Sequence, residues 1–368
     1  MKRSSMANKL LTSICDTYNI KYPIFGFAHS VNAVIAITNA GGLGVFGGTR
    51  STPGEIEQAM ATIRAAVGDK PFGIDLVMPP GMPQQDNRDA IEAEIPAEHR
   101  QFVNRIKEKY QVPDGTKPGM RSRFVRSTEM EDQQLAAVMA SDVNLFACGI
   151  GAPPRAIDQA KALGKKTCAL VGSPHHVQRA MQSELDLIVA QGYDAGAHTG
   201  EIGTFSLVPQ IVEAADGIPV LAAGGVATGR HIAASLMLGA VGVWIGTAWL
   251  TTEEHQDHMS PMNQKKLLEA GPSDTVISRA DSGKTLRQIR SAWSQEWASD
   301  EAPAPLKMPY QDILVGDILG AIDEHSVEPL VHSPAGQGIG WFNEVTTVEA
   351  TMQKLVAEAV ETLEGRSY

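Results

Sequence analysis

The segment from Gln191 to Gly203, which reads QGYDAGAHTGEIG, holds the residue types best suited to chemistry in this chain. It follows a short apolar run typical of a buried strand and precedes a helix-like segment. Its glycines allow the backbone to approach a ligand closely, and the start of a helix offers free N–H groups to an anion. His198 is the one side chain of the segment that exchanges a proton near neutral pH. We therefore predict an anion site with His198 as a general base aimed at a bound substrate.

Glycines also end the two apolar runs that follow, as AGGV at 223–226 and GT at 246–247. If these are neighbouring strand ends, Gly224, Gly225 and Gly246 form a phosphate cradle with the helix that starts near Thr228. The hydroxyl of Thr247 is a further donor. The alternative is that the glycines only permit tight turns. Two glycine-bearing ends in adjacent positions favour the phosphate site.

The other polar residues of the first segment have supporting roles. Gln191 is a neutral hydrogen-bond partner for a cofactor ring, and Asp194 orients the loop. For His198 the alternative role is a local cap or hydrogen bond. Its glycine-rich setting at a strand end favours the catalytic interpretation.

Histidines elsewhere are weaker candidates. His29 follows the first apolar run and is a candidate for substrate contact, with packing as an equal alternative. His175 and His176 are adjacent and point different ways, so they do not supply two metal ligands. His255 and His258 lie in TTEEHQDHM, where a solvated loop is favoured over a metal site. We predict no metal ion, and the HExxH, Walker and GxSxG motifs are absent.

Eight short apolar runs alternate with helical patterns. The predicted strands are 22–27, 43–46, 72–77, 143–148, 167–171, 185–190, 218–222 and 241–245. Near-continuous apolar strands are typical of a parallel sheet covered on both faces. A series of eight predicts a (β/α)8 TIM barrel, with a doubly wound open sheet as the alternative. In a barrel the glycine ends and His198 would share one rim, at the carboxyl ends of the strands.

Two stretches do not follow this alternation of strands and helices. Residues 78–128 are rich in Pro, Gly and charge, and only 97–110 is predicted to be helical, so this is a functional insert after the third strand. Residues 251–345 are predicted to form a helical extension over the barrel mouth. A helix over 347–363 is expected to pack back on the barrel. The predicted division is therefore 1–250, 251–345 and 346–368.

The composition argues against several classes of binding partner. The formal net charge is −11 without a cluster of Lys and Arg, which argues against nucleic acid. No apolar run reaches the roughly 18 residues that a membrane helix needs, and the N-terminus lacks the apolar region of a secretion signal. Three cysteines far apart suit a reduced cytoplasmic protein. We expect a small-molecule substrate, no membrane partner, and leave homo-oligomerisation open.

Six segments together resemble the nitronate monooxygenase family, once called 2-nitropropane dioxygenases. They are QGYDAGAHTG, AAGGVATG, VWIGTAWL, NAGGLGVFGG at 39–48, SDTVISRADSGK at 273–284 and AGQGIG at 335–340. The resemblance spans most of the chain and implies a barrel that binds FMN non-covalently. The residues it implies for the FMN phosphate are Gly224, Gly225, Gly246 and Thr247. Those it implies along the flavin are Gln191, Gly192 and Gly196. His198 matches the histidine that deprotonates the nitroalkane or assists substrate binding in the family.

Three departures from the family pattern bear on the reaction more than on FMN. The family often shows QxPM after the first strand, where this chain reads YPIFGFAHS. It often shows GGH where this chain has Gly196-Ala197-His198, and an alanine has less backbone freedom than a glycine. The insert at 78–128 is longer than in simple members.

Three functions remain open at this point. The favoured one is FMN-dependent oxidation of a nitronate or similar stabilised carbanion with O2, with His198 as base. The second is NAD(P)H-dependent reduction of quinones or enoyl thioesters by an FMN enzyme. The acidic composition weighs against it, although the insert could supply basic groups. The third is a non-catalytic binding barrel.

Overall fold

The computed structural model describes residues 10–365. Its centre is a closed barrel of parallel strands in the order β1-β2-β3-β4-β5-β6-β8-β9, with β9 pairing back to β1. The strands are β1 (Ile24–Ala28), β2 (Leu43–Gly47), β3 (Gly73–Val77), β4 (Leu145–Gly149), β5 (Lys166–Val171), β6 (Leu187–Gln191), β8 (Val220–Ala223) and β9 (Gly242–Ile245). The predicted TIM barrel is confirmed, and each predicted run overlaps one of these strands. The pairing of β9 with β1 excludes the open sheet.

Alternate residues of each strand point to opposite faces, which separates two cores. Phe25, Val45 and Val189 belong to the core inside the barrel. Ile24 and Phe146 belong to the core between the strands and the surrounding helices. Because both faces are covered, the strands are apolar along their whole length.

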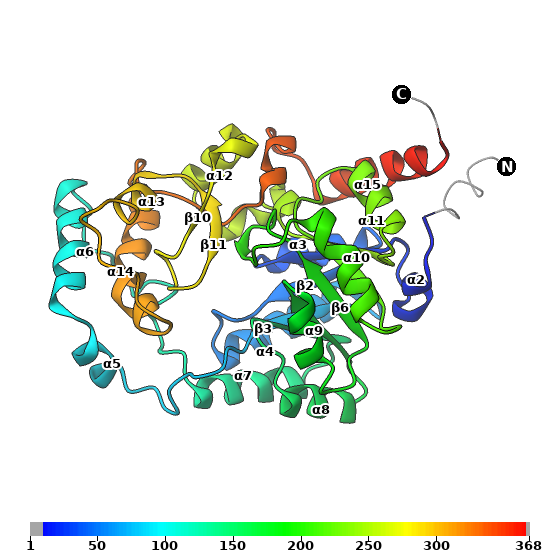
Figure 1. The fold of residues 1–368 in the computed structure, drawn as a ribbon, viewed down its shortest axis with the longest axis horizontal. Coiled ribbons are helices and arrows are strands. Elements are labelled where there is room, and N and C mark those ends of the chain that lie inside the picture. The colour runs from blue at the N-terminus through cyan, green and yellow to red at the C-terminus, as the bar shows by residue number, and fades with distance from the viewer. Residues whose placement is uncertain (1–9, 366–368) are drawn as a thin grey trace.

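Helices follow the strands and form an outer ring (Figure 1). They are α3 (Val31–Asn39), α4 (Pro53–Val67), α7 (Thr128–Ala140), α8 (Pro154–Ala162), α9 (Pro174–Ala180), α10 (Thr204–Ala214), α11 (Gly229–Met237) and α15 (Val348–Leu363). Helix α15 packs against α11 and α3, so the end of the chain completes the ring. Thr52 begins α4 with a capping box.

A short helix, α2 (Ser13–Tyr18), lies at the amino ends of the barrel strands. Its Ile14 and Tyr18 join the interior core, and the Tyr18 ring meets the Phe25 ring edge-on. Within the described residues, this helix fills the amino end of the barrel, and the large cavity lies at the carboxyl ends of the strands.

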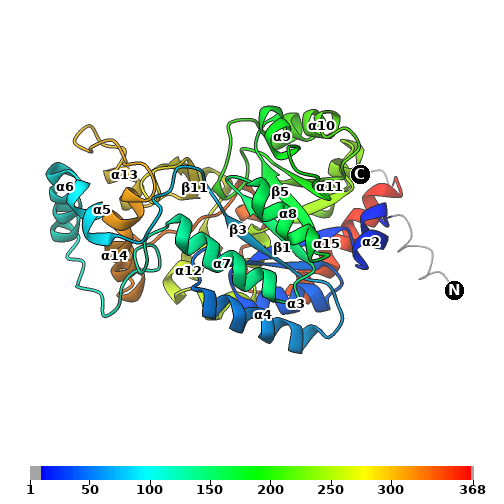
Figure 2. The same ribbon diagram turned by 90° about the horizontal axis from the view of Figure 1, so that it is seen from below.

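The insert and the C-terminal extension fold together into a cap beside the barrel mouth (Figures 1 and 2). Its helices are α5 (Arg88–Glu94) and α6 (Ala97–Lys109) from the insert, and α12 (Pro261–Glu269), α13 (Ala292–Glu296) and α14 (Tyr310–Glu324) from the extension. Phe102 and Ile106 pack against Trp293, Trp297 and Ile318 in a separate apolar core. The insert therefore contains one more helix, α5, than the sequence indicated.

A small antiparallel sheet links the cap to the barrel. It pairs β10 (Thr275–Ser278) with β11 (Leu286–Ile289), and β11 with β7 (Ala197–His198). Only helices were expected between 251 and 345, and the β-branched residues of β10 explain why strands form there instead. Short 3₁₀ turns join the other elements, namely η2 (Thr247–Trp249), η3 (Glu253–His258), η4 (Pro272–Asp274) and η5 (Gln337–Trp341).

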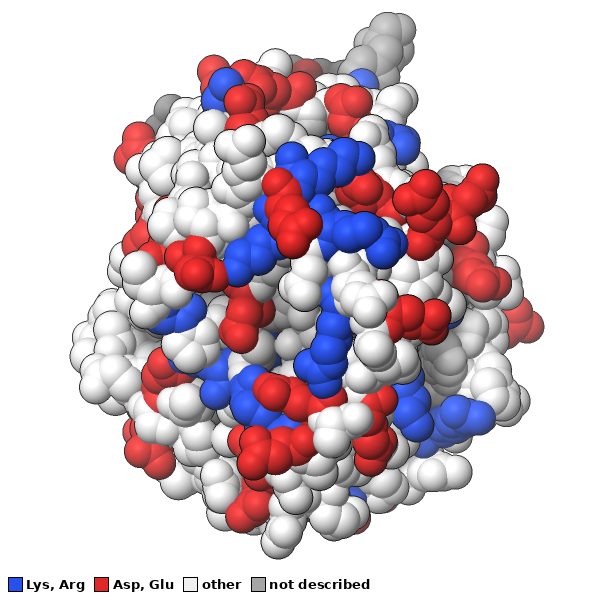
Figure 3. All heavy atoms as spheres, turned by 90° about the vertical axis from the view of Figure 1, so that its left-hand side faces the viewer, with Lys and Arg blue, Asp and Glu red and all other residues white. Residues whose placement is uncertain are grey.

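Acidic and basic side chains are interspersed on the cap side of the molecule (Figure 3). Such a mixed surface lacks the single-sign field that nucleic acid requires. Within residues 10–365, no helix combines the length and apolar character needed to span a membrane.

Candidate active site

A cavity of about 1500 Å³ lies between the carboxyl ends of the barrel strands and the cap. All but one of the site residues expected from the sequence line it: His29, Gln191, Gly196, His198, Gly224, Gly225, Gly246 and Thr247. The exception is Gly192, which lies behind the loop. A Cβ on Gly192 would come within 2.2 Å of the Thr204 hydroxyl, so this glycine permits close packing on α10.

The loop after β6 is held in one shape by its own hydrogen bonds. The Gln191 amide donates to the His198 carbonyl at 2.5 Å, and the Thr199 hydroxyl donates to the Gly192 carbonyl at 2.9 Å. Ala197 has a φ of +60°, a left-handed conformation that costs a non-glycine residue about 1 kcal/mol. The pairing of β7 with β11 stabilises this conformation at Ala197 and His198.

His198 is attached to the cap by its ring. Its Nε2 lies 2.8 Å from Oγ of Ser282, in the loop between β10 and β11. Burial, followed by the positive charge of Arg121, lowers the pKa of His198 to about 3. The imidazole is therefore neutral across the physiological pH range, and its conjugate acid is strong.

The glycine-bearing strand ends present unpaired backbone donors. Within the described residues, the N–H groups of Gly224, Gly225, Gly246 and Thr247 donate to no other protein group. Gly224 and Gly225 have φ values of +97° and +73°, which turn the chain at the end of β8. Because backbone N–H groups require acceptors, these four are arranged to bind an anion.

Helix α11 contributes less to this cradle than the sequence indicated. Its first N–H, on Gly229, donates to the Glu358 carboxylate of α15 at 2.8 Å, and its Thr228 cap accepts from the His231 N–H. The α11 start is therefore occupied by protein groups, because α15 packs across it. The free donors belong to the strand ends.

The segment around η5 joins the two halves of the site. The Gly336 N–H donates to Oγ1 of Thr247 at 3.0 Å, and the Gln337 N–H donates to the Asp194 carbonyl at 2.9 Å. The Asp194 carboxylate accepts from the Thr204 N–H at the start of α10 at 3.0 Å, which is the orienting role expected for it. With its oxygen accepting from Gly336, the Thr247 hydroxyl keeps its proton for another acceptor.

Asp75 of β3 is a cavity residue that the sequence analysis missed. It is 5% exposed, and its Oδ1 has no hydrogen-bond partner within the described residues. Burial alone raises the pKa of Asp75 to about 7. An acidic residue inside the apolar run GIDLV was the available signal.

A charged network anchors the cap over the cavity, and it also escaped the sequence analysis. Asp312 of α14 accepts from Arg50 at 2.7 Å and lies 3.4 Å from Arg121. Arg121 also lies 3.4 Å from Asp281, which pairs with His332 at 3.1 Å. Burial acts to lower the pKa of His332, but the Asp281 carboxylate raises it above its ordinary value. These partners are far apart in sequence, so no local pattern indicates them.

Three histidines form a row on another wall of the cavity. His29 Nδ1 lies 3.0 Å from the Gly47 carbonyl, and the His29 ring stacks on His258. His255 meets His258 edge-on and is buried, not solvated as expected. Burial and the neighbouring His258 lower the pKa values of His29 and His255 to about 4. Across residues 10–365, no group of three or more His, Cys, Asp or Glu side chains is arranged to hold a metal ion.

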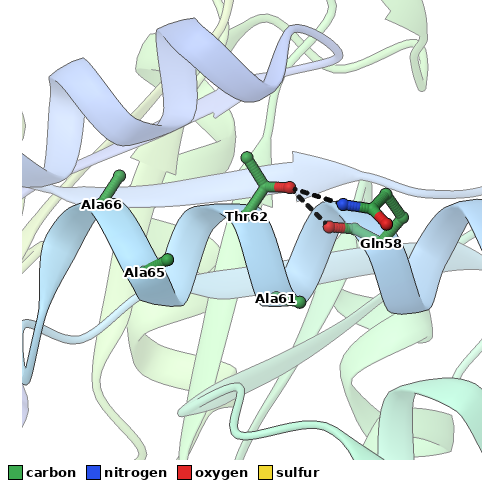
Figure 4. A pocket seen from close by; sticks show the side chains of 5 residues that line it. All are labelled: Gln58, Ala61, Thr62, Ala65 and Ala66. Carbon is green, nitrogen blue, oxygen red and sulfur yellow. Dashed lines mark hydrogen bonds between the residues drawn. The ribbon is translucent and has the colours of Figure 1, made fainter.

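A second hollow lies on the outer face of α4 (Figure 4). It is lined by Gln58, Ala61, Thr62, Ala65 and Ala66, all exposed. The Gln58 amide donates to the Thr62 hydroxyl at 3.1 Å. This hollow contains no group that titrates, so it is not a candidate for catalysis.

Comparison with known proteins agrees with this geometry. The sequence model of the family described as nitronate monooxygenase matches residues 8–358. A Mycobacterium tuberculosis (strain ATCC 25618 / H37Rv) protein, Rv1533, described as a monooxygenase, is 37% identical over 366 residues, which is 96% of this chain and 97% of its own. Among solved structures, the nitroalkane oxidase of Streptomyces ansochromogenes has a TM-score of 0.81 at 26% identity, over 96% of this chain and 99% of its own. FabK from Thermotoga maritima has a TM-score of 0.74 at 25% identity, over 96% and 97%.

Proposed function

The chain belongs to the nitronate monooxygenase family of flavin-dependent oxidoreductases, and from this we propose that it uses FMN to oxidise a nitronate or similar stabilised carbanion with O2. One observation carries the proposal. A neutral histidine and four unpaired backbone N–H groups meet in one cavity at the barrel mouth. A histidine beside an anion cradle suits a small substrate held against a phosphate-bearing cofactor.

We assign the FMN phosphate to Gly224, Gly225, Gly246 and Thr247. A dianion satisfies their free N–H groups, and the cradle has room because a Cβ on Gly246 would meet no atom closer than 4.0 Å. When bound, the flavin supplies the acceptor for the electrons of the carbanion. The assignments along the ring are Gln191 and Gly196, with Gly192 supporting the loop from behind.

His198 is the residue assigned to the substrate. The role of base, expected from the sequence, requires a ring nitrogen with a free lone pair facing the cavity. The low pKa of His198 supplies the neutral form but makes it a weak base. His29 is assigned to substrate contact because it lines the same cavity.

The visible spectrum of the purified protein, followed by O2 uptake with a nitronate, tests the proposal. We expect a bound flavin and turnover. His198→Asn is expected to retain FMN, and it would lose most activity on a neutral nitroalkane only if His198 removes the substrate proton. His175→Asn, on the exposed face of α9, is the matched control and is expected to behave as the parent. A protein that takes up no FMN, or that binds FMN and oxidises no nitronate, would contradict the proposal.

A second candidate, NAD(P)H-dependent reduction of a quinone or enoyl thioester, is favoured by one observation. Lys117, Arg279 and Lys284 line the cavity mouth and form no ion pair with another described residue. Positively charged side chains at the entrance of a cavity attract phosphate-bearing substrates. Rapid loss of the oxidised flavin absorbance on mixing with NADH or NADPH, without a nitro compound, would favour this function.

A further inference from the structure

The hydroxyl of Ser282 has a single hydrogen-bond acceptor within the described residues. Ser282 is fully buried. Its Oγ contacts two described groups, His198 Nε2 at 2.8 Å and the backbone N–H of Lys284 at 3.4 Å. The Lys284 N–H is itself a donor, so it cannot accept the hydroxyl proton. A buried hydroxyl left without an acceptor costs about 1–3 kcal/mol, so Ser282 donates to His198 Nε2.

This donation determines the tautomer of the neutral imidazole. When Nε2 accepts, the ring proton resides on Nδ1. Nδ1 of His198 has no hydrogen-bond partner within the described residues, and the atom is not buried. It is therefore accessible from the cavity that the ring lines. The nitrogen that meets the substrate therefore carries a hydrogen.

From this arrangement we infer that Ser282 is a positioning residue that holds His198 as a hydrogen-bond donor toward the substrate. On this inference, which rests on the proposed function, His198 does not remove a proton. The Nδ1–H binds an oxygen of a substrate that arrives already as the anion, a preformed nitronate.

The charges around His198 act in the same direction. Besides burial, which lowers the pKa of His198 most, Arg121 and Arg50 both lower it, and Asp312 opposes them only in part. A positive potential that disfavours an imidazolium ion stabilises an anionic substrate at the same place. A general base would need the opposite environment, because it becomes positively charged as it works.

The tautomer can be observed directly. In the full-length holoprotein labelled with 15N-histidine, long-range 1H–15N spectra distinguish a protonated from an unprotonated ring nitrogen, and His198→Asn identifies the signal. We expect protonated Nδ1 and unprotonated Nε2. Ser282→Ala is expected to abolish this preference, whereas Ser278→Ala, in the same hairpin, is expected to preserve it. A proton on Nε2 in the parent protein would overturn the inference.

Substrate preference provides an independent test. Turnover of a neutral nitroalkane is expected to be no faster than its spontaneous ionisation, and the preformed nitronate is expected to turn over directly. His198→Asn, which keeps an N–H near Nδ1, should retain nitronate turnover within about tenfold, while His198→Leu should lose about 100-fold, the usual effect of removing an oxyanion donor. Equal losses in both variants, or neutral nitroalkane consumed faster than it ionises, would refute the donor role. Failure of the parent to oxidise any nitronate would refute the proposed function instead and leave the tautomer result standing.

Discussion

Asp75→Asn removes a buried carboxyl of β3 whose Oδ1 has no hydrogen-bond partner within the described residues, so its effect on stability can be worked out from the structure. The side chain is 5% exposed, and no cationic group opposes its desolvation. Asparagine has nearly the same shape and cannot ionise. The substitution therefore isolates the free-energy cost of the buried charge.

The size and sign of the change in stability follow from the pKa of Asp75. Burial raises it from 3.8 to about 7, so the folded protein holds a proton that the unfolded chain has lost. Stability falls as the pH rises from about 4 to about 7 and is constant above. At 1.36 kcal/mol per pKa unit, the full loss is about 4 kcal/mol. Relative to the parent, Asp75→Asn should gain about 2 kcal/mol at pH 5 and about 4 kcal/mol at pH 8.

Denaturant unfolding of the flavin-free protein, followed by circular dichroism at pH 5 and pH 8, measures this difference. The difference of about 2 kcal/mol between the two pH values corresponds to a rise of about 3 °C in melting temperature for a chain of this size. Asp69→Asn, on the exposed turn before β3, removes the same charge and should show no such pH dependence. If Asp75→Asn and the parent change stability with pH in parallel, Asp75 is not a desolvated, unpaired acid and the reasoning fails.

Three further predictions concern the cradle, the cap and the helical ring. Gly246→Val should leave the melting temperature of flavin-free protein unchanged, because its surroundings are open, yet weaken FMN binding by on the order of 100-fold in a fluorescence titration. Asp312→Asn should cost about 3 kcal/mol in denaturant unfolding, since it leaves two guanidinium groups without their shared carboxylate; no loss would mean that the cap is held otherwise. Gly229→Ala should destabilise the protein by about 1–3 kcal/mol by calorimetry, because its Cβ would meet the Ala359 nitrogen at 2.2 Å. Gly54→Ala, where a Cβ meets nothing within 4 Å, is the control and should be neutral.

The local parts of the site were predictable because they depend on neighbouring residues. Glycines directly after apolar runs at 223–226 and 246–247 indicated strand ends, and the carboxyl ends of barrel strands share one rim. The same rule brought His198 and His29 to that rim from separate strands. Asp75 could also have been identified from the sequence, because an acidic residue inside an apolar strand is unusual.

The long-range parts were not predictable from a single sequence. Ser282 lies 84 residues from His198, and Asp312 lies 262 residues from Arg50. Neither pair has a local signature, since the contacts form only when the cap folds against the barrel mouth. The expected role of the α11 start changed for the same reason, because Glu358 arrives there from α15.

The sequence by itself therefore determined the barrel, the rim on which its glycine ends meet and the histidine that stands among them, since periodicity and strand order are local properties of the chain. Only the tertiary structure decided which nitrogen of His198 meets the cavity and which charges surround it. A tautomer depends on the partner of the other ring nitrogen, and that partner, Ser282, is supplied by a distant hairpin.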